Sequence, residues 1–285
     1  MVKKRHFRPR VNSRRLLLDL STPMVKKWLP RGYMSLIFLF LYAPIVVLVV
    51  FSFNESQSSG HWTGFSFRWY TELFRDSRMQ TAVTYTLIVA VISTTVSTVV
   101  GTLSAIGIHK LKKKTKAYVL NVNYFPVINP EIVTAIGLMM LFRSLRMNFG
   151  LGTMLLAHIL FSIPYVIIAI LPRLRMMDPN LEEAALDLGA TPMQAIRKVV
   201  IPEIKPGILA GALMAFTMSF DDFVISFFNT GQGVTNLSIE VYSMARRGIR
   251  PTVNALATIM IALVIIMVLI ANNISIKNKR SVTEK

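Results

Sequence analysis

The 285-residue chain contains no cysteine, which excludes disulfide bonds, thiolate metal sites and cysteine nucleophiles together. It also lacks the GxxxxGK[ST] phosphate-binding loop, so we do not expect the chain itself to hydrolyse ATP. Acidic residues are scarce, since 14 Asp and Glu stand against 32 Lys and Arg and leave a net charge of +18. In a soluble protein this charge would indicate nucleic-acid binding. Long apolar runs make that interpretation unsuitable here.

Six apolar stretches are long enough to cross a bilayer core of about 30 Å. They cover approximately residues 33–53, 82–108, 117–142, 150–171, 207–228 and 254–276. We therefore expect an all-α membrane protein with six transmembrane helices in one domain over 33–276. A basic N-terminal arm (1–32) precedes this domain, and a short tail (277–285) follows it. The second stretch is rich in Ser, Thr and Gly, which favours close packing of helices in lipid.

The positive charges predict the orientation of the spans. Every Lys and Arg falls outside the six stretches, and 24 of the 32 lie on the side that carries both termini. Short loops rich in Lys and Arg remain cytoplasmic, so we expect both termini and the loop at about 172–206 to be cytoplasmic. The external stretch 54–81 holds Trp62, Trp69 and Tyr70. These aromatic residues suit either a membrane-interface belt or a surface for an external partner.

Only three charged side chains fall within the predicted spans, and all three are acids: Glu131, Asp221 and Asp222. An ionised side chain at mid-bilayer costs roughly 2.5–3.5 kcal/mol on insertion scales and therefore indicates function. Glu131 follows Asn129-Pro130, which predicts a broken helix with Asn129 as its cap. A capped kink without a substrate role is the alternative. Carboxylates at one depth, with no Lys or Arg in the spans, favour a cation as the transported solute.

Other polar and aromatic residues of the spans have two interpretations each. Asp221 and Asp222 should project about 100° apart if their helix is regular, so we expect only one to face a pore. Phe220, Phe223 and Phe227 form a stripe that serves either packing or cation–π contact. His158 is a lone histidine in the fourth span, and we expect a hydrogen-bonded structural role rather than catalysis or proton relay.

The cytoplasmic loop contains the sequence LEEAALDLGATPMQAIRKVVIP at 181–202. Periodicity predicts two short helices, the first capped by Asp178 and ended by Gly189 in a left-handed conformation. Thr191 and Gln194 form a capping-box pattern for the second helix. We expect Pro202 and Pro206 to end it. Leu181, Ala184, Ala185 and Leu188 share one face of the first helix, which suits a cleft in another protein. An ordinary amphipathic surface helix is the alternative.

This segment resembles the cytoplasmic EAA loop of bacterial ABC importer permeases. From about Tyr33 to Ile276 the chain is similar to spermidine/putrescine permeases of the PotC type, in the family of binding-protein-dependent type I ABC importer permeases. The stretches that carry the resemblance, besides the loop, are LYAPIVVLVVFSFN, INPEIVTAIGL, MSFDDFVISFF and VYSMARRGIRPTVNALATI. The usual Ile-x-Leu-Pro ending of the loop is Val199-Val200-Ile201-Pro202 here.

The resemblance implies a type I ABC importer permease fold with a cytoplasmic coupling helix, in the bacterial cytoplasmic membrane. It implies that Glu183, Ala184, Ala185 and Gly189 form the ATPase-coupling loop. It further implies that Glu131, Asp221 and Asp222 line the path of a polyamine. The implied partners are a PotB-like second permease, a PotA-like ATPase dimer that uses ATP and Mg²⁺, a PotD-like binding protein and membrane lipid. No cofactor is expected on this chain.

Two alternatives remain at this point. The first is an ABC permease for a different cationic small solute, because the carboxylates do not specify which cation is carried. The second is a secondary carrier driven by an ion gradient. Six spans without an internal repeat are few for such a carrier, and the EAA-like loop would have no role in it.

Overall fold

A computed structural model describes residues 23–57, 61–247, 251–262 and 265–266 of the chain. It divides into two compact units, Met1–Trp69 with Pro251–Lys285 and Tyr70–Arg250, which are described separately. Most of the expected N-terminal arm, the expected C-terminal tail and the second half of the expected sixth span lie outside the described residues.

The first unit contains a long apolar helix, α1 (Pro23–Phe51), which continues through Pro44 without interruption. Most of its apolar side chains are exposed, as expected for a helix surrounded by lipid. A loop follows in which Asn54 pairs with Phe65 in an isolated antiparallel bridge. The indole nitrogen of Trp69 donates to the carbonyl oxygen of Asn54, and Trp69 is only 2% exposed. Trp69, at the start of the following helix, thus packs against this loop and offers no surface to a partner. The interpretation of the exposed Trp62 stays a prediction.

This unit also contains a short apolar helix, Pro251–Ala262, which begins the expected sixth span. Residues 263–264 and 267–285 lie outside the described part of the chain, so the length of that span stays a prediction.

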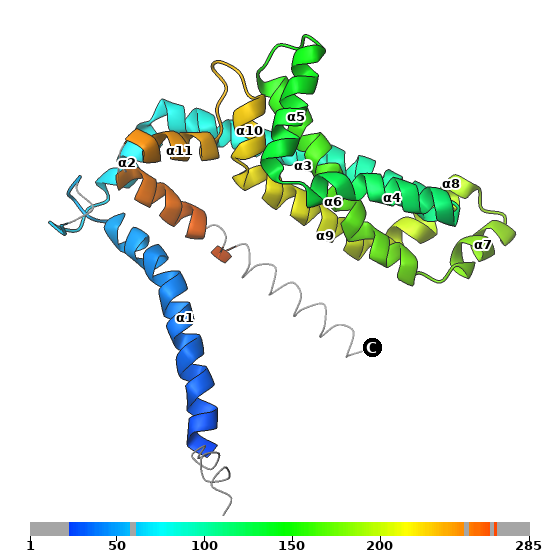
Figure 1. The fold of residues 1–285 in the computed structure, drawn as a ribbon, viewed down its shortest axis with the longest axis horizontal. Coiled ribbons are helices and arrows are strands. Elements are labelled where there is room, and N and C mark those ends of the chain that lie inside the picture. Colours follow the sequence, from blue (N-terminus) through cyan, green and yellow to red (C-terminus); the bar gives the residue numbers. More distant parts are fainter. Residues whose placement is uncertain (1–22, 58–60, 248–250, 263–264, 267–285) are drawn as a thin grey trace, which may run out of the picture. The chain divides into compact units, whose positions relative to one another are not determined.

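The second unit holds the remaining helices (Figure 1). After α2 (Arg68–Arg75), which begins at the boundary of the two units, they are α3 (Ser77–Lys110), α4 (Lys113–Ile128), α5 (Glu131–Ser144), α6 (Leu151–Met176), α7 (Asn180–Asp187), α8 (Pro192–Ala195), α9 (Ile201–Asp221), α10 (Val224–Asn229) and α11 (Leu237–Arg247). A π-helical turn, Ile196–Val200, joins α8 to α9.

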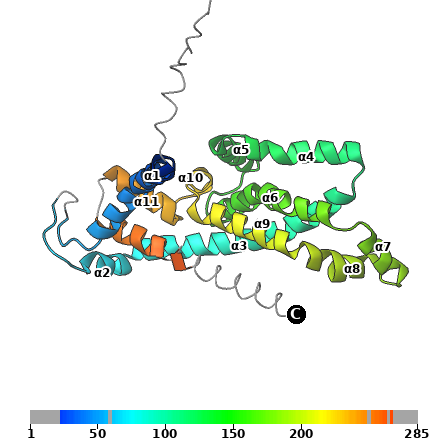
Figure 2. The same ribbon diagram turned by 90° about the horizontal axis from the view of Figure 1, so that it is seen from below.

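The core of the second unit is formed by α3, α6 and α9, which pack side by side (Figure 2). Val166 of α6 is fully buried between Gly101 of α3 and Gly211 of α9. A Cβ atom at Gly101 would lie 2.7 Å from Cγ1 of Val166, so no larger residue fits without movement. Lipid gives apolar helices little reason to associate, and close backbone approach at small residues supplies the packing instead. The predicted packing role of the small residues in the second span is confirmed at this position.

The structure describes helices at the places of the first five expected apolar stretches. Among the described residues, four helical stretches are long and apolar enough to span a membrane: Arg31–Phe51, Ser77–Lys110, Leu151–Met176 and Pro192–Asp221. The helices α4 and α5 meet at an angle of 105° and together form either one broken span or a re-entrant loop. This bend confirms the predicted break at Asn129-Pro130.

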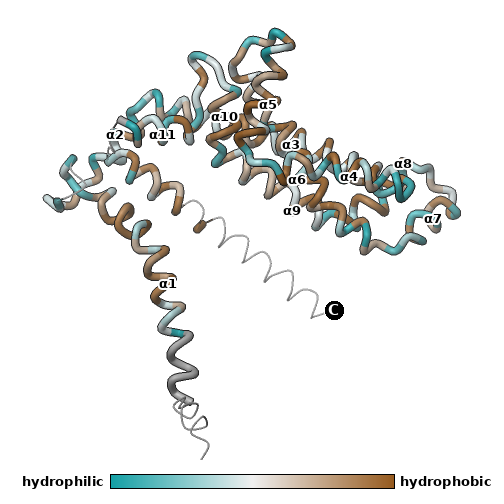
Figure 3. Tube along the Cα trace, viewed as in Figure 1, coloured by the Kyte–Doolittle hydropathy of each residue, from teal (hydrophilic) through white to brown (hydrophobic). Residues whose placement is uncertain are grey.

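Within the second unit, the helices separate polar from apolar regions. The segments α7 and α8 lie at one end of the α3–α6–α9 bundle, whereas α10 and α11 lie toward the other end (Figures 1 and 2). Figure 3 shows hydrophobic residues along the bundle and hydrophilic residues around α7 and α8. The loop of α7 and α8 and the acidic residues of the fifth span are therefore well separated along the bundle.

Candidate substrate path and coupling segment

The fifth predicted span is interrupted directly after Asp221. Helix α9 ends at this residue, Asp222 has an extended backbone (φ −62°, ψ 128°), and α10 begins at Val224. A regular helix over residues 207–228 was expected, and that expectation is wrong at this point. The reason is local competition, because an aspartate carboxylate can bond backbone N–H groups and so favours the start of a new helix over the continuation of the old one.

The carboxylate of Asp222 caps α10. Its oxygens accept from the backbone N–H groups of Ile225 (3.0 Å) and Ser226 (2.7 Å) and from the Ser226 hydroxyl (2.8 Å). Asp222 is only 5% exposed, whereas Asp221 is exposed. The two aspartates therefore differ in burial, and they do not project from two positions of one regular helix as expected.

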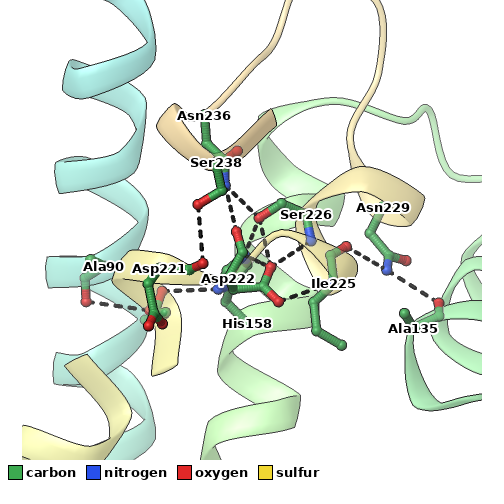
Figure 4. Close-up of polar contacts among 12 residues, drawn as sticks. Ala90, Ala135, His158, Asp221, Asp222, Ile225, Ser226, Asn229, Asn236 and Ser238 are labelled. Carbon is green, nitrogen blue, oxygen red and sulfur yellow. Dashed lines mark hydrogen bonds and ion pairs between the residues drawn. The ribbon is translucent and has the colours of Figure 1, made fainter. Parts of the chain in front are cut away.

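His158 lies beneath this cap, on α6, and is 1% exposed (Figure 4). Its Nε2 lies 2.8 Å from Oγ of Ser226 and 3.5 Å from a carboxylate oxygen of Asp222. Its Nδ1 lies 2.9 Å from Oγ of Ser219, and Ser219 in turn accepts from Ser93 of α3 at 2.9 Å. The predicted hydrogen-bonded role of His158 is confirmed, and through it α3, α6, α9 and α10 share one buried polar network.

Two residues outside the fifth span complete this arrangement. The side-chain amide of Asn236 donates to the carbonyl oxygen of Asp222 (3.1 Å) and to Oγ of Ser226 (2.7 Å). The hydroxyl of Ser238 donates to the carbonyl oxygen of Asp221 (3.0 Å). Sequence reasoning missed both residues, because no local pattern links them to a break that lies 14 to 17 residues earlier.

Glu131 is the first residue of α5 and is exposed. The expectation that Asn129 caps this helix is wrong: the N-cap position is Pro130, which makes no side-chain cap hydrogen bond, and Asn129 ends α4 instead. A residue before proline is driven out of the helical region by the proline ring. Asn129 accordingly has an extended backbone, with ψ 146°.

The three acids lie near one another in space. Glu131 interacts electrostatically with both Asp222 and Asp221, and α5 packs against α10. The buried amide of Asn229 in α10 reinforces this contact by donating to the carbonyl of Ala135 in α5 at 3.2 Å. Within the described residues, neither Glu131 nor Asp221 has an ion pair with Lys or Arg. The same part of the chain contains no group of three or more His, Asp or Glu side chains arranged to hold a metal ion.

The expected phenylalanine stripe divides at the break. Phe220 stacks on Phe216 within α9, with ring centroids 5.6 Å apart. Phe223 and Phe227 instead contact Tyr242 of α11, at centroid distances of 4.5 and 6.4 Å. Packing accounts for all of these contacts, so the alternative of a cation–π role is not required by them. Tyr242 was not singled out from the sequence, since it lies on a separate helix.

At the other end of the bundle, α7 has the predicted end, but its N-cap position is Pro179, without a side-chain cap hydrogen bond, and not Asp178 as expected. The Asp178 carboxylate accepts from the backbone N–H of Asn180 at 2.9 Å. Gly189 has a φ of +86°, which confirms the predicted left-handed conformation. The N–H of Gly189 bonds to the carbonyl of Leu186, and the N–H of Ala190 bonds to that of Ala185. These two bonds form a Schellman motif, which ends the helix and satisfies its last carbonyl groups.

The second helix of the loop differs from the prediction in its length. Its capping box is confirmed, because Thr191 accepts from the backbone of Gln194 and the Gln194 side chain accepts from the backbone of Thr191. Pro202 and Pro206, however, do not end it: the helical chain continues from Pro192 to Asp221. The π turn at Ile196–Val200 precedes Pro202, so that Pro202 lies in the first α-helical turn, where a missing N–H is tolerated.

The loop presents apolar side chains to its surroundings. Leu188 is 89% exposed and Met193 is 71% exposed, and α7 contains no buried residue. Of the four residues assigned to coupling, Glu183, Ala184 and Gly189 are exposed and Ala185 is half-buried. Glu182, the neighbour of Glu183, instead forms an ion pair with Lys110 at the end of α3. The role of the four residues in coupling stays a prediction.

Residues 97–280 match the family described as the binding-protein-dependent transport system inner membrane component. The chain is 37% identical over 246 residues to the spermidine/putrescine transport system permease protein PotC of Escherichia coli K12, covering 86% of this chain and 93% of that protein. Identity to the protein of the same name from Haemophilus influenzae is 36%, with 90% and 99% of the two chains covered. Identity to the putrescine transport system permease protein PotI of Escherichia coli K12 is 39%, with 82% and 86% covered.

Among solved structures, the chain is similar to a chain of a bacterial ABC transporter involved in the import of the acidic polysaccharide alginate. The TM-score is 0.68 at 19% identity, and the match covers 89% of this chain and 97% of that chain. A second structure of a bacterial alginate ABC transporter, in complex with a pentasaccharide-bound periplasmic protein, matches with a TM-score of 0.63. At this identity the likeness shows the fold alone, and that fold is the importer permease fold expected from the sequence.

Proposed function

The chain belongs to the family of binding-protein-dependent transport system inner membrane components, and from this premise we propose that the solute it carries is a polyamine of the spermidine and putrescine class. The chain is a multi-pass membrane permease subunit and not itself an enzyme. The observation that carries the proposed solute is the two exposed acids, Glu131 and Asp221, which lie at two interrupted spans whose helices α5 and α10 pack against each other. The names of the relatives, which cover most of the chain, support the same solute.

The chemistry of the acids suits an organic polycation. Alkyl ammonium groups are protonated at neutral pH, as the Lys side chain is. Two carboxylates without a Lys or Arg partner among the described residues leave negative charge available to neutralise such groups during passage. Broken helices at membrane depth are tolerated where they line a cavity, which is consistent with both breaks lying beside the acids.

The three acids have different roles in this proposal. Glu131 and Asp221 contact the passing polyamine, because both side chains are exposed. Asp222 contributes through its negative charge and its cap on α10, because its oxygens already accept three hydrogen bonds. Tyr242, Phe223 and Phe227 form an apolar wall beside the break that fits the methylene segments of a polyamine.

The exposed loop of α7 and α8 supports docking of an ATPase subunit. Ala184 and Ala185 of α7, Leu188 at its end and Met193 of α8 form an apolar surface. The bond from Asn180 to Asp178 and the Schellman motif at Gly189 fix the two ends of α7. Such a helix can transmit a displacement as a rigid element. We assign the ATP-driven step to a PotA-like ATPase dimer, and the delivery of solute to a PotD-like binding protein. A PotB-like second permease completes the path, and membrane lipid surrounds the complex.

Orientation is tested by cysteine labelling, which is clean because the chain has no cysteine of its own. Single cysteines at Lys112 and Glu183 should react only from the cytoplasmic side, and a cysteine at Trp62 or Arg247 only from the external side. Both termini should likewise be cytoplasmic. External labelling at position 183 would contradict the proposed topology and the coupling role together.

The solute is tested with the full complex in proteoliposomes, by uptake of labelled spermidine and putrescine and by stimulation of ATP hydrolysis by the loaded binding protein. The double variant Glu131→Gln, Asp221→Asn keeps size and hydrogen bonding but removes both charges. We expect uptake to fall about tenfold or more, which corresponds to about 1.4 kcal/mol, with assembly unchanged. Normal uptake by this variant would refute the role of the acids in the path.

The remaining alternatives give different results in the same assay. Stimulation of ATP hydrolysis by another loaded cationic solute, and not by polyamines, would indicate a permease for that solute. Uptake that follows an imposed ion gradient without ATP would indicate a secondary carrier. The exposed coupling loop would then have no partner, which makes this the less favoured outcome.

A further inference from the structure

The break between α9 and α10 releases backbone groups that a continuous helix would pair. In such a helix the N–H of Ile225 would bond to the carbonyl of Asp221, and that of Ser226 to the carbonyl of Asp222. Both N–H groups bond to the Asp222 carboxylate instead. Two carbonyl groups, those of Asp221 and Asp222, therefore need other donors, because an unpaired backbone carbonyl is costly away from water.

Both carbonyl groups are satisfied by the start of α11. Asn236 donates to the carbonyl of Asp222 at 3.1 Å, and Ser238 donates to that of Asp221 at 3.0 Å (Figure 4). Asn236 is 3% exposed, and its side-chain oxygen accepts from the backbone N–H of Ile239 at 2.9 Å. The same residue thus caps α11 and bonds to the break.

The surroundings of the break differ between the side that faces α6 and the side that faces α11. On the side of α6, Ser226 is hydrogen-bonded to His158, and His158 is in turn hydrogen-bonded to Ser219 of α9 inside the bundle. On the side of α11, the loop residues Gly233 to Thr235, Glu240 of α11 and the start of α3 border an open cleft of about 370 Å³. The start of α11 is therefore hydrogen-bonded to the carbonyl groups of Asp221 and Asp222 on one side and borders the open cleft on the other.

We propose that Asn236 and Ser238 are positioning residues for transport, which hold the main chain of Asp221 and Asp222 so that the Asp221 carboxylate faces the path. The inference rests on the proposed role of Asp221 in that path. Because the carbonyl carbon of Asp221 is bonded to its Cα atom, a donor that holds this carbonyl helps to fix the position of the Cα atom and of the side chain attached to it. A displacement of α11 changes the position of the acid through these two bonds.

The test is a double-variant cycle in the assembled importer, with spermidine uptake at saturating loaded binding protein as the readout. Ser238→Ala removes one hydroxyl at a partly exposed position and should not disturb folding. We expect it to lower the maximal rate about two- to tenfold, the range for a single neutral hydrogen bond. Ser238→Thr keeps the hydroxyl and should restore the parental rate.

The decisive comparison uses Asp221→Asn. If Ser238 acts through Asp221, Ser238→Ala should have no further effect on uptake in the Asp221→Asn background. Thr235→Ala is the matched control, because Thr235 bonds to Asn236 and Glu240 of the same segment but not to the break. It should leave the rate unchanged in both backgrounds.

The outcomes separate the two proposals. Equal fold losses from Ser238→Ala with and without Asp221→Asn would overturn the positioning role while leaving the path role of Asp221 in place. Parental uptake by Asp221→Asn alone would overturn the path role of that residue, and the positioning inference with it. A Ser238→Ala loss that matches a loss of assembled complex would also overturn the inference, because it would indicate a structural effect only.

Discussion

The break at Asp222 and the loop of α7 and α8 are both short interruptions of helical structure, but they differ in the sequence separation of the hydrogen bonds that stabilise them. The loop is held by bonds between residues close in sequence, such as Thr191 with Gln194 and Ala190 with Ala185. The break is also held by residues far away in sequence, among them His158 and Asn236. The loop is exposed and the break is buried. Local bonds leave a surface free for a partner, whereas long-range bonds fix a position inside the bundle.

This comparison predicts that variants of the buried Asp222 cap act on stability and that variants of the exposed loop act on coupling. The largest effect is expected for Asp222→Ala. It leaves two backbone N–H groups and the Ser226 hydroxyl without their acceptor, and buried donors without partners cost roughly 1–3 kcal/mol each. Thermal stability of the purified permease and yield of the complex should both fall.

Asp221→Ala is the matched control, because the neighbouring carboxylate is exposed and its loss should leave thermal stability nearly unchanged. Equal stability losses in the two aspartate variants would remove the distinction between a buried cap and an exposed path residue. Asp222→Asn should be intermediate, since its amide group can still accept one of the hydrogen bonds.

The second largest effect is expected for Gly189→Val in the loop. A left-handed conformation costs a residue with a Cβ atom roughly 1–2 kcal/mol, and a β-branched residue more. The end of α7 should rearrange, so that uptake and co-purification of the ATPase fall while insertion of the permease is unchanged. Gly189→Asn should retain most activity, because asparagine tolerates this conformation. Equal activity of both variants would show that the shape of this helix end is not used in coupling.

A smaller effect is expected for Glu183→Lys, which reverses a charge on the exposed face of α7. It should weaken ATPase association in a salt-dependent manner, because exposed charges are screened. Pull-down of the ATPase at low and high ionic strength measures this effect. Unchanged association at low salt would argue that Glu183 lies outside the docking surface.

The smallest effect is expected for Lys110→Met, which removes the ion pair between α3 and Glu182. Lys110 is about half exposed, and exposed ion pairs typically contribute about 0–1 kcal/mol. Thermal stability should change little, and coupling should persist because the caps of α7 are intact. A large loss of coupling would show that α7 depends on its contact with α3 and not on local bonds alone.

Much of the architecture follows from sequence patterns that are local, such as apolar stretches, proline positions and helix caps. The apolar stretches predicted the spans that the structure describes, and Asn129-Pro130 predicted the bend of 105°. Gly189 and the Thr191–Gln194 pair predicted their own conformations, because caps depend on residues within one helical turn. The three intramembrane acids identified the region of the candidate path for the same reason: their cost in a membrane is a property of each residue.

The sequence by itself thus determined the first five apolar stretches, the left-handed end of α7, the capping box of α8 and the presence of three acids in stretches that contain no Lys or Arg. Only the tertiary structure decided that Asp221 is exposed while Asp222 is buried, and that Asn236 and Ser238 bond to the break between α9 and α10. The apolar pattern predicted one regular helix there, because it shows which side chains are apolar and not whether the backbone hydrogen bonds of the helix are interrupted. Which backbone groups are paired depends on donors that folding brings from distant segments.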